Sequence, residues 1–194
     1  PLRGQYRGAE IFTIPPPGSG LHLIQLLNIA SFWPISQWGL NSAHYLHHLT
    51  EAMRLVFADR EAYLGDPDYV QVPVEKLLSP DSARLKANLI RSNGVLMEYL
   101  PEEIKEKTEA GNTTHLCVID DKGNAVALTQ SINHFFGSGI IPEGTGFILN
   151  NQLDDFASTS SGPNAPGPGR RPASSMAPLF LFQEGKLRLI LGSP

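Results

Sequence analysis

The stretch NTTHLCVIDDKGNAVALT, residues 112–129, decides the fold. Residues 114–119 and 125–129 are rich in β-branched and apolar side chains, which is typical of strands. Between them, residues 120–124 (DDKGN) carry the Asp, Gly and Asn that favour a tight turn. The stretch therefore predicts an antiparallel hairpin. A calcium loop is a poor alternative, because the ligand spacing and terminal Glu of such loops are missing.

The chain before this hairpin has the patterns of helices. A long helix is expected to start near Asn41 or Ser42, either of which can cap it, and its apolar positions recur mostly at spacings of three and four. It is expected to end near Gly65, before the turn at residues 66–68 (DPD). The expected elements are a strand at residues 10–14, a loop at 15–20 (PPPGSG), helices at 21–29, 42–64 and 82–90, and an exposed polar segment at 102–111.

Strands dominate the chain after the hairpin. They are expected at residues 146–149, 178–182 and 187–191, and the last two are joined by a turn at 183–186. Residues 157–171 are rich in Ser, Pro and Gly and are expected to form a loop. Helices first and antiparallel hairpins later predict an α/β layered fold whose sheet is assembled from the second half of the chain.

Composition excludes several classes of protein. The chain has 194 residues, a net charge of −4, one cysteine and 18% charged residues. An internal disulfide is impossible, and a mildly acidic chain without a basic cluster argues against nucleic acid as the main partner. The sequence has no run of 18 apolar residues, so it predicts no membrane span.

The two ends indicate an internal fragment of a longer protein. The chain opens at Pro1 without a Met, and it stops at Pro194 directly after an apolar run expected to be a strand. Any targeting signal is therefore expected upstream of residue 1.

Thr113 is the most informative candidate for chemistry, because it follows a polar linker and opens a core strand. A threonine hydroxyl is a weak nucleophile and needs a base. If the bond before Thr113 were cut, the new α-amine, with an ordinary pKa of roughly 7.7–8.0, could be that base. On spacing alone, the alternative of an ordinary β-forming threonine is favoured.

Three other groups of residues have both a functional and a structural interpretation. Residues 150–155 (NNQLDD) form either an exposed turn or a binding site, because such a polar cluster is costly to bury. Residues 171–176 (RPASSM) offer two hydroxyls that could hold a carboxylate, although a plain loop end is the simpler interpretation. His44, His47 and His48 share a helix and could bind a metal, but without a Cys or HExxH partner a packed or solvated helix face is favoured.

Taken together and in order, these motifs resemble the γ-glutamyltranspeptidase family of N-terminal nucleophile hydrolases. The matching stretches cover essentially the whole chain: residues 6–8 (YRG), 15–20 (PPPGSG), 58–68 (ADREAYLGDPD), 113–115 (TTH), 121–126 (DKGNAV), 149–156 (LNNQLDDF), 171–176 (RPASSM) and 191–194 (LGSP). Because so many motifs occur in the family's order, the probability of chance agreement is very small.

The resemblance implies a self-cleaving proenzyme. The cleaved bond would be Asn112–Thr113, so that residues 1–112 end a large subunit and residues 113–194 begin a small one. The implied fold is part of a four-layer αββα sandwich, in which the helices before residue 112 cover the sheet that Thr113 begins. The implied activity is that of a γ-glutamyltransferase and glutathione hydrolase, which transfers a γ-glutamyl group through a Thr113 ester to water, an amino acid or a peptide.

The resemblance also implies a role for each site residue. Ser131, where the family commonly has Thr, would hydrogen-bond the nucleophile. Asn133, Gln152 and Asp155 would gather around the glutamyl α-amino group, and Ser174 and Ser175 would contact the α-carboxylate. No metal or organic cofactor is implied, because the nucleophile carries its own base.

Two family parts are expected outside these residues: an Arg for the α-carboxylate upstream, and an oxyanion-binding Gly-Gly pair directly after Pro194. The 194 residues alone are therefore expected to be inactive. The short segment between Asp155 and Ser174 resembles that of members without a lid over the site. Bacterial members are usually exported to the periplasm or medium. The alternatives are a cephalosporin-acylase-type relative and an unprocessed, non-catalytic homologue.

Overall fold

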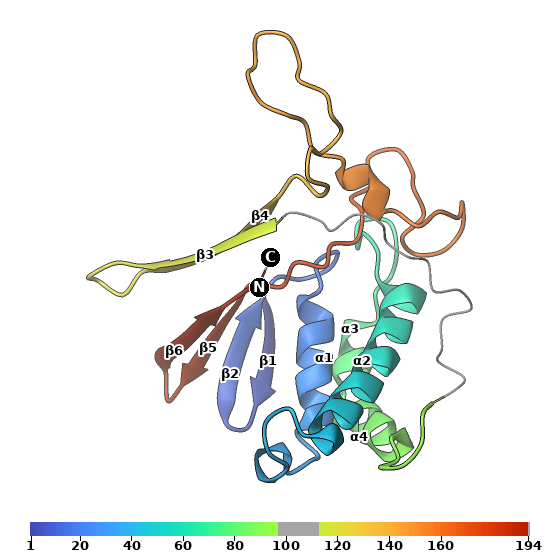
Figure 1. Cartoon of the computed structure of the whole chain (residues 1–194), viewed down its shortest axis with the longest axis vertical. Coiled ribbons are helices and arrows are strands. Elements are labelled where there is room, and N and C mark those ends of the chain that lie inside the picture. The colour runs from blue at the N-terminus through green and yellow to red at the C-terminus, as the bar shows by residue number, and fades with distance from the viewer. Residues whose placement is uncertain (97–112, 194) are drawn as a thin grey trace.

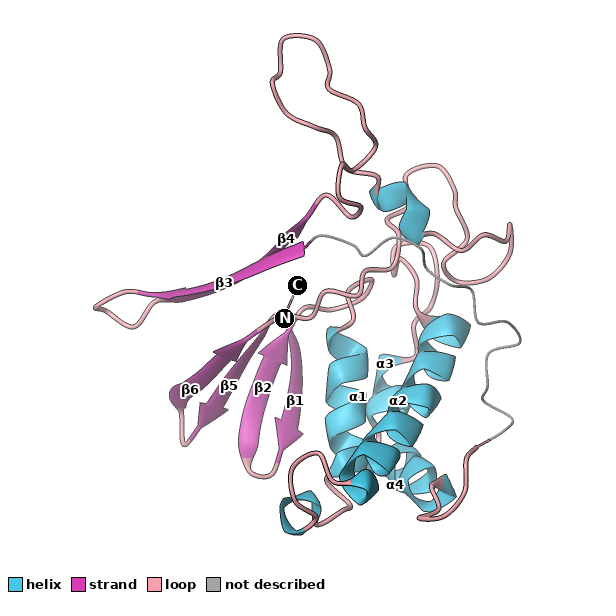
Figure 2. Ribbon diagram, viewed as in Figure 1, coloured by secondary structure: helices cyan, strands magenta, loops and turns pink. Residues whose placement is uncertain are grey.

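The computed structural model describes residues 1–96 and 113–193. Asn112, the expected polar segment at 102–111 and Pro194 lie outside the described residues. The helices are α1 (Gly20–Ala30), α2 (Ala43–Tyr63), α3 (Val74–Leu78) and α4 (Pro80–Leu89), with 3-10 turns at Ile35–Gln37 and Gln152–Asp155. The strands are β1 (Leu2–Tyr6), β2 (Ala9–Thr13), β3 (Thr113–Ile119), β4 (Ala125–Ser131), β5 (Leu179–Gln183) and β6 (Lys186–Leu191) (Figures 1 and 2).

The larger sheet joins the two halves of the chain. Its order is β1-β2-β5-β6, and every neighbouring pair is antiparallel. The expectation that the sheet comes from the second half alone was wrong, because β2 pairs with β5 in the register Thr13 with Leu179. The pairing places Leu179 of β5 beside Ile11 of β2, so that both pack in one cluster with Ile24 of α1.

The core lies between this sheet and the helices. Ile11 of β2, Leu21 and Ile24 of α1 and Leu179 of β5 are almost completely buried. A second cluster joins α1 to α2 and α4 through residues that include Ile29 and Leu55. Helix α1 therefore packs against β1 and β2, and α2, α3 and α4 pack against α1 (Figure 1). The expectation was that the helices cover the sheet that Thr113 begins.

The hairpin of β3 and β4 confirms the expectation from its sequence. The register runs from Thr113 opposite Ser131 to Ile119 opposite Ala125. At the turn, the Asp120 carboxylate accepts hydrogen bonds from the backbone and side chain of Asn124, which hold the pKa of that carboxyl below its usual range. Gly123 takes a φ of +81°, a conformation that suits glycine.

The helix boundaries follow local capping. Ser42 caps α2 by accepting from the Tyr45 N–H, as expected. Helix α4 begins at Pro80, two residues before the expected start, because Ser79 accepts from the Ser82 N–H and proline suits the first helical turn. No helix in the described ranges has both the length and the apolar character needed to cross a bilayer.

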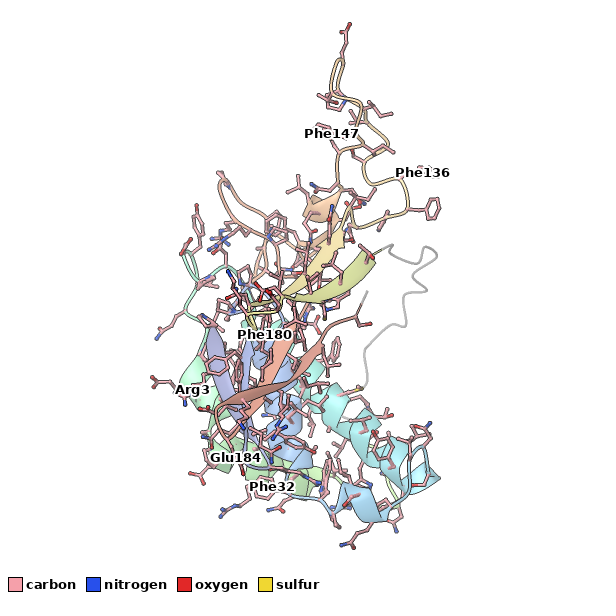
Figure 3. All side chains as sticks on the ribbon, turned by 90° about the vertical axis from the view of Figure 1, so that its left-hand side faces the viewer. Arg3, Phe32, Phe136, Phe147, Phe180 and Glu184 are labelled. Carbon is pink, nitrogen blue, oxygen red and sulfur yellow. The ribbon has the colours of Figure 1, made fainter. Side chains whose placement is uncertain are left out.

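The strand expected at residues 146–149 does not form. Residues 146–149 lie in the long projecting loop at 132–151, where Gly144 and Gly146 have φ values of +76° and +71°. Such values interrupt an extended ladder. Phe136 and Phe147 on this loop are exposed to solvent (Figure 3).

Candidate active site at the start of strand β3

Thr113 and Ser131 face each other across the hairpin. Thr113 is the first residue of β3, and Ser131 is the last residue of β4 and its direct partner in the register. The Thr113 hydroxyl donates to Ser131 Oγ at 3.0 Å, and both residues are half-buried. The expected hydroxyl neighbour of the candidate nucleophile is therefore within hydrogen-bonding distance.

Asn133 extends this contact. Ser131 Oγ accepts the Asn133 backbone N–H at 2.8 Å. Asn133 has a φ of +72°, a left-handed conformation that Asn tolerates better than most residues. Its side-chain amide donates to the Asn151 carbonyl at 3.3 Å and to Asp155 Oδ1 at 3.4 Å.

Asp155 ends the 3-10 turn Gln152–Asp155. Its other oxygen, Oδ2, accepts a hydrogen bond from the Gln152 side-chain amide. Together with the preceding contacts, this bond completes a continuous hydrogen-bonded group of five residues, which passes through the Asn133 backbone N–H: Thr113, Ser131, Asn133, Gln152 and Asp155. The sequence separates the hairpin residues from Gln152 and Asp155 by the long loop, and the fold brings them together.

Arg60 is a charged neighbour of Asp155, whereas its sequence favoured a simple ion pair with Asp59. It lies near the C-terminal end of α2, and its Nε donates to Ser19 Oγ at 3.4 Å. Burial lowers the pKa of the Arg60 guanidinium, and the nearby negative charge of Asp155 opposes that shift. Arg60 therefore supplies positive charge close to the Asp155 carboxylate.

Ser174 and Ser175 are positioned by the loop after β2. The Ser174 backbone N–H donates to the Pro17 carbonyl at 2.9 Å, and the Ser19 hydroxyl donates to the Ser174 carbonyl at 2.7 Å. Ser174 is half-buried and Ser175 is exposed. The Pro/Gly loop at residues 15–20 thus fixes the backbone of the two serines before the chain enters β5.

Asp66 anchors the same segment from another direction. Its side chain is only 2% exposed, and its two oxygens accept bonds from the backbone N–H and the guanidinium of Arg171. These bonds hold the pKa of Asp66 far below its usual range. The sequence showed only a helix-ending turn at residues 66–68, and no local signal pointed to a partner so far along the chain.

Gly192 lies against His115, two residues beyond Thr113 on β3. A Cβ at Gly192 would be 2.1 Å from the His115 ring, so only glycine fits without rearrangement. The His115 Nδ1 is hydrogen-bonded to Thr129 Oγ1 at 2.7 Å, which fixes the ring. The chain after β6 therefore passes the beginning of β3, where an oxyanion-binding turn is expected.

The histidines of α2 form an aromatic cluster. The His48 ring lies 5.1 Å from Trp33 and 4.6 Å from Trp38, and the His44 ring is 4.3 Å from Trp38. Within the described part of the chain, no group of three or more His, Cys, Asp or Glu side chains could hold a metal ion. The packed-face interpretation of these histidines is the one that the geometry supports.

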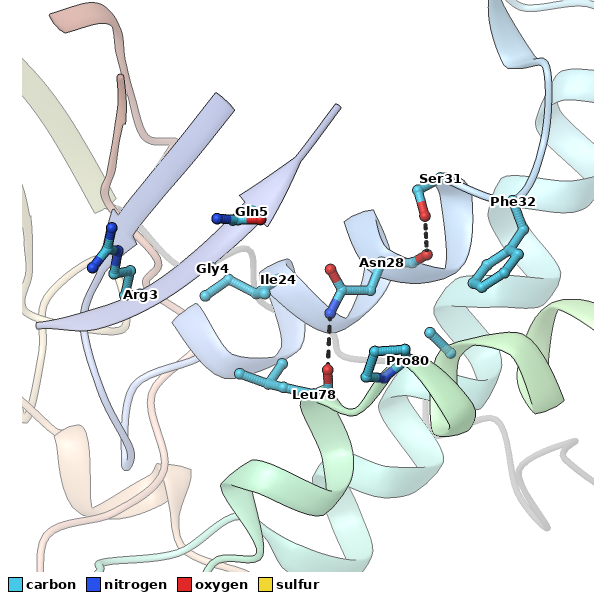
Figure 4. Close-up of a pocket in the computed structure, with 10 residues that line it drawn as sticks. Arg3, Gly4, Gln5, Ile24, Asn28, Ser31, Phe32, Leu78 and Pro80 are labelled. Atoms are coloured by element: carbon cyan, nitrogen blue, oxygen red, sulfur yellow. Dashed lines mark hydrogen bonds between the residues drawn. The ribbon is translucent and has the colours of Figure 1, made fainter. Parts of the chain in front are cut away.

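Two pockets lie away from the proposed site. One, of about 490 Å³, lies between β1, α1 and α4, where Asn28 donates to the Leu78 carbonyl at 3.3 Å (Figure 4). The other, of about 240 Å³, is lined mainly by apolar and aromatic side chains that include Trp33 and Trp38. Neither pocket is lined by a site residue predicted from the sequence.

The arrangement of helices and antiparallel sheets is shared with a solved structure. A cephalosporin acylase from Bacillus halodurans superposes with a TM-score of 0.77 and is 29% identical, over 98% of this chain and 33% of that chain. This superposition assigns the fold to the class of N-terminal nucleophile hydrolases. The model of the gamma-glutamyltranspeptidase family matches residues 1–194, and the chain belongs to that family.

Curated relatives agree with this assignment. The glutathione hydrolase proenzyme of Escherichia coli strain K12 is 39% identical over 207 residues, which cover 100% of this chain and 36% of the relative. The acylase ACY 1 proenzyme of Pseudomonas sp. strain V22 is 38% identical and covers 100% of this chain and 34% of the relative. The chain thus spans about a third of the length of the curated relatives it matches.

Proposed function

We propose that the whole protein is a γ-glutamyltransferase and glutathione hydrolase in which Thr113 is the nucleophile. The observation that carries the proposal is the hydrogen-bonded group that runs from Thr113 through Ser131 and Asn133 to Asp155. It connects a nucleophile to a carboxylate that suits the ammonium group of an amino acid. Glutathione hydrolase proenzymes at 39% identity support the same substrate class.

Self-processing is the first proposed step. Thr113 Oγ attacks the carbonyl carbon of Asn112, the C–N bond breaks, and the acyl group moves from nitrogen to oxygen as an ester. Water then hydrolyses this ester, which frees the Thr113 hydroxyl and α-amine. Residues 1–112 and 113–194 would thereby belong to a large and a small subunit of one precursor.

Catalysis then uses the same hydroxyl. The Thr113 α-amine accepts the hydroxyl proton as Oγ attacks the γ-carbonyl of the donor, and the proton passes to the leaving amine. The resulting γ-glutamyl ester is resolved by water or by the amine of an amino acid or peptide. Ser131 orients the Thr113 hydroxyl by the 3.0 Å contact between their oxygens.

The donor's amino-acid end has two charged groups. In the proposal, Asp155 binds the α-ammonium with the help of Asn133 and Gln152, and Ser174 and Ser175 donate to the α-carboxylate. A short segment between Asp155 and Ser174 leaves the acceptor side open. Export to the periplasm or medium is proposed from the family resemblance, and cell fractionation of the full-length protein tests it.

A second candidate function is hydrolysis of a glutaryl side chain. The 38% identity to acylase ACY 1 and the superposition on the cephalosporin acylase favour it. A glutaryl group has no α-ammonium, so it gives no role to the Asp155 carboxylate. The polar surroundings of Asp155 therefore support the γ-glutamyl donor.

The decisive experiment uses the full-length protein, its Thr113→Ala variant and a Thr113→Ser control. Denaturing gels are expected to show two bands for the unchanged protein and the control, and one for Thr113→Ala. The unchanged protein is expected to hydrolyse a γ-glutamyl anilide faster than a glutaryl anilide. A single uncleaved band without activity would overturn the proposal, and a preference for the glutaryl anilide would favour the acylase. The isolated 194 residues are expected to be inactive.

A further inference from the structure

Asn164 connects two parts of the proposed donor site through one side chain. Its Nδ2 donates to the backbone carbonyl of Asp155 at 2.7 Å, and its Oδ1 accepts the backbone N–H of Ala173 at 2.8 Å. A carbonyl only accepts and an N–H only donates, so these partners fix which way the amide faces. The amide therefore spans the gap between the end of the 3-10 turn and the residue before Ser174.

The two ends that Asn164 joins differ in how they are held. The Asp155 side belongs to the hydrogen-bonded group at the end of the hairpin, whereas Ser174 is bonded to the loop after β2. The chain between them is rich in Ser, Pro and Gly and forms no helix or strand. Such a connection does not by itself fix the distance between its ends.

Asn164 itself is firmly placed. Its backbone carbonyl accepts the Ala157 N–H at 2.9 Å, and the side chain is half-buried. The preceding residue, Pro163, lies so close to the end of α2 that a Cβ at Gly65 would be 2.2 Å from the Pro163 carbonyl oxygen. The amide is thus held against the helical layer while it contacts both ends.

We propose that Asn164 is a positioning residue that sets the spacing between the ammonium-binding Asp155 and the carboxylate-binding Ser174 and Ser175. The inference rests on the proposed function. A ligand with both an ammonium and a carboxylate must satisfy both ends at once, so it depends on their spacing. A ligand with only one of these groups can adjust its position and depends on the spacing much less.

Three small acids, used as competitive inhibitors of γ-glutamyl anilide hydrolysis, distinguish a ligand that needs both ends from a ligand that needs only one. L-Glutamate carries both α-groups, glutarate lacks the ammonium, and 4-aminobutanoate lacks the α-carboxylate. The full-length processed protein is compared with Asn164→Ala and with Asn164→Gln, which keeps the amide one methylene further out. Thr159→Ala is the matched control, because Thr159 lies in the same loop and, within residues 1–96 and 113–193, its hydroxyl bonds only to the nearby Ser161 carbonyl.

The expected result is selective. In Asn164→Ala, the inhibition constant of L-glutamate and the KM of the anilide rise about tenfold, because the two donor-binding ends are no longer held at the spacing that the donor needs, while kcat changes less than about threefold. The inhibition constants of glutarate and 4-aminobutanoate stay within about twofold. Asn164→Gln shows a smaller rise with the same selectivity, and Thr159→Ala behaves like the unchanged protein.

Other results overturn the inference. Equal losses for all three acids, or a fall in kcat alone, would show a general structural role, and unchanged constants would show no role. If Asn164→Ala fails to fold or process, the selectivity in Asn164→Gln decides. If the unchanged protein neither cleaves itself nor hydrolyses the anilide, the proposed function and this inference are both overturned. If the unchanged protein is active but the Asn164 variants affect all three acids equally, only the inference is overturned.

Discussion

Asp66 and Arg171 are 105 residues apart in the chain and form an ion pair that is reinforced by the Arg171 backbone N–H. Asp66 Oδ2 accepts the Arg171 backbone N–H at 2.8 Å and its Nε at 3.0 Å, while the guanidinium also reaches Asp68 at 2.7 Å. In a processed protein this contact would link the two subunits, just ahead of the serines proposed to bind the donor carboxylate.

Removing Arg171 is expected to destabilise the full-length protein strongly. Arg171→Ala leaves the Asp66 carboxylate, which is only 2% exposed, without its guanidinium partner, so the free energy of unfolding should fall clearly more than in a control variant. Arg170→Ala is the matched control, because the Arg170 guanidinium contacts the Ala165 carbonyl and the Tyr69 ring. Urea unfolding gives the free energy of unfolding of both variants. If both lose the same amount, about 1 kcal/mol or less, the ion pair does not have the proposed stabilising role.

The same pair predicts a dependence on acid. Hydrogen bonds from Arg171 lower the native pKa of Asp66, so the pair's contribution is present above the ordinary carboxyl pKa of about 4 and is lost as pH falls below it. In Arg171→Ala the native pKa of Asp66 is expected to rise, because burial then dominates. The difference in unfolding free energy between the two proteins should shrink from pH 6 to pH 3. A constant difference would argue against this origin.

His22 predicts a second acid effect in a separate pH range. Burial lowers the pKa of His22 to about 4, and neither ring nitrogen has a hydrogen-bond partner among the described residues. Its neutral form is favoured by folding, so stability is present above pH 6.5 and is lost as pH falls from 6.5 to 4, by roughly 2–3 kcal/mol. His22→Leu should remove this slope. His47→Gln, which replaces a half-buried imidazole bonded to the Arg91 carbonyl, should keep it, and a persistent slope in His22→Leu would refute the assignment.

Ser131 is expected to affect the chemical step. Ser131→Ala removes the hydroxyl that lies 3.0 Å from Thr113 Oγ1, and kcat with a γ-glutamyl anilide should fall about tenfold with little change in KM. Ser131→Thr keeps the hydroxyl and should retain most of the rate. A rise in KM without a loss of kcat would instead place Ser131 in donor binding.

Asp155 is expected to affect donor binding. Asp155→Asn removes the charge proposed to hold the α-ammonium, and the inhibition constant of L-glutamate should rise about 10- to 100-fold. The constant for glutarate, which has no ammonium, should change little. Asp154→Asn is the control, because the neighbouring Asp154 is exposed and accepts from the Asn151 side chain. A similar loss for glutarate would show that Asp155 acts through the structure alone.

Local patterns predicted the parts of the fold that local forces form. Ser42 and the spacing of apolar residues identified α2, and residues 120–124 identified the turn of the β3–β4 hairpin. The strand expected at residues 146–149 failed, because a short apolar run has no preference for a strand without a pairing partner. Strand β1, whose sequence is LRGQY, was missed because its outward-facing residues are polar.

The site divides in the same way. Motif order and family resemblance proposed Thr113, Ser131, Asn133, Gln152 and Asp155, and the structure brings these five into one hydrogen-bonded group. The roles proposed for them stay predictions. Arg60 and Asp66 lie in a matching motif, but nothing local identified their partners, and Asn164 had no local signal, because these partners are distant in the chain or belong to an irregular loop.

The sequence by itself determined the hairpin, the main helices and the threonine that opens β3, because capping, periodicity and turn chemistry depend on residues a few positions apart. Only the tertiary structure decided that β2 pairs with β5, that Asp66 anchors Arg171, and that Asn164 joins Asp155 to Ala173. These contacts close loops of very different length, and their stability depends on packing and burial that become defined only when the whole chain is folded.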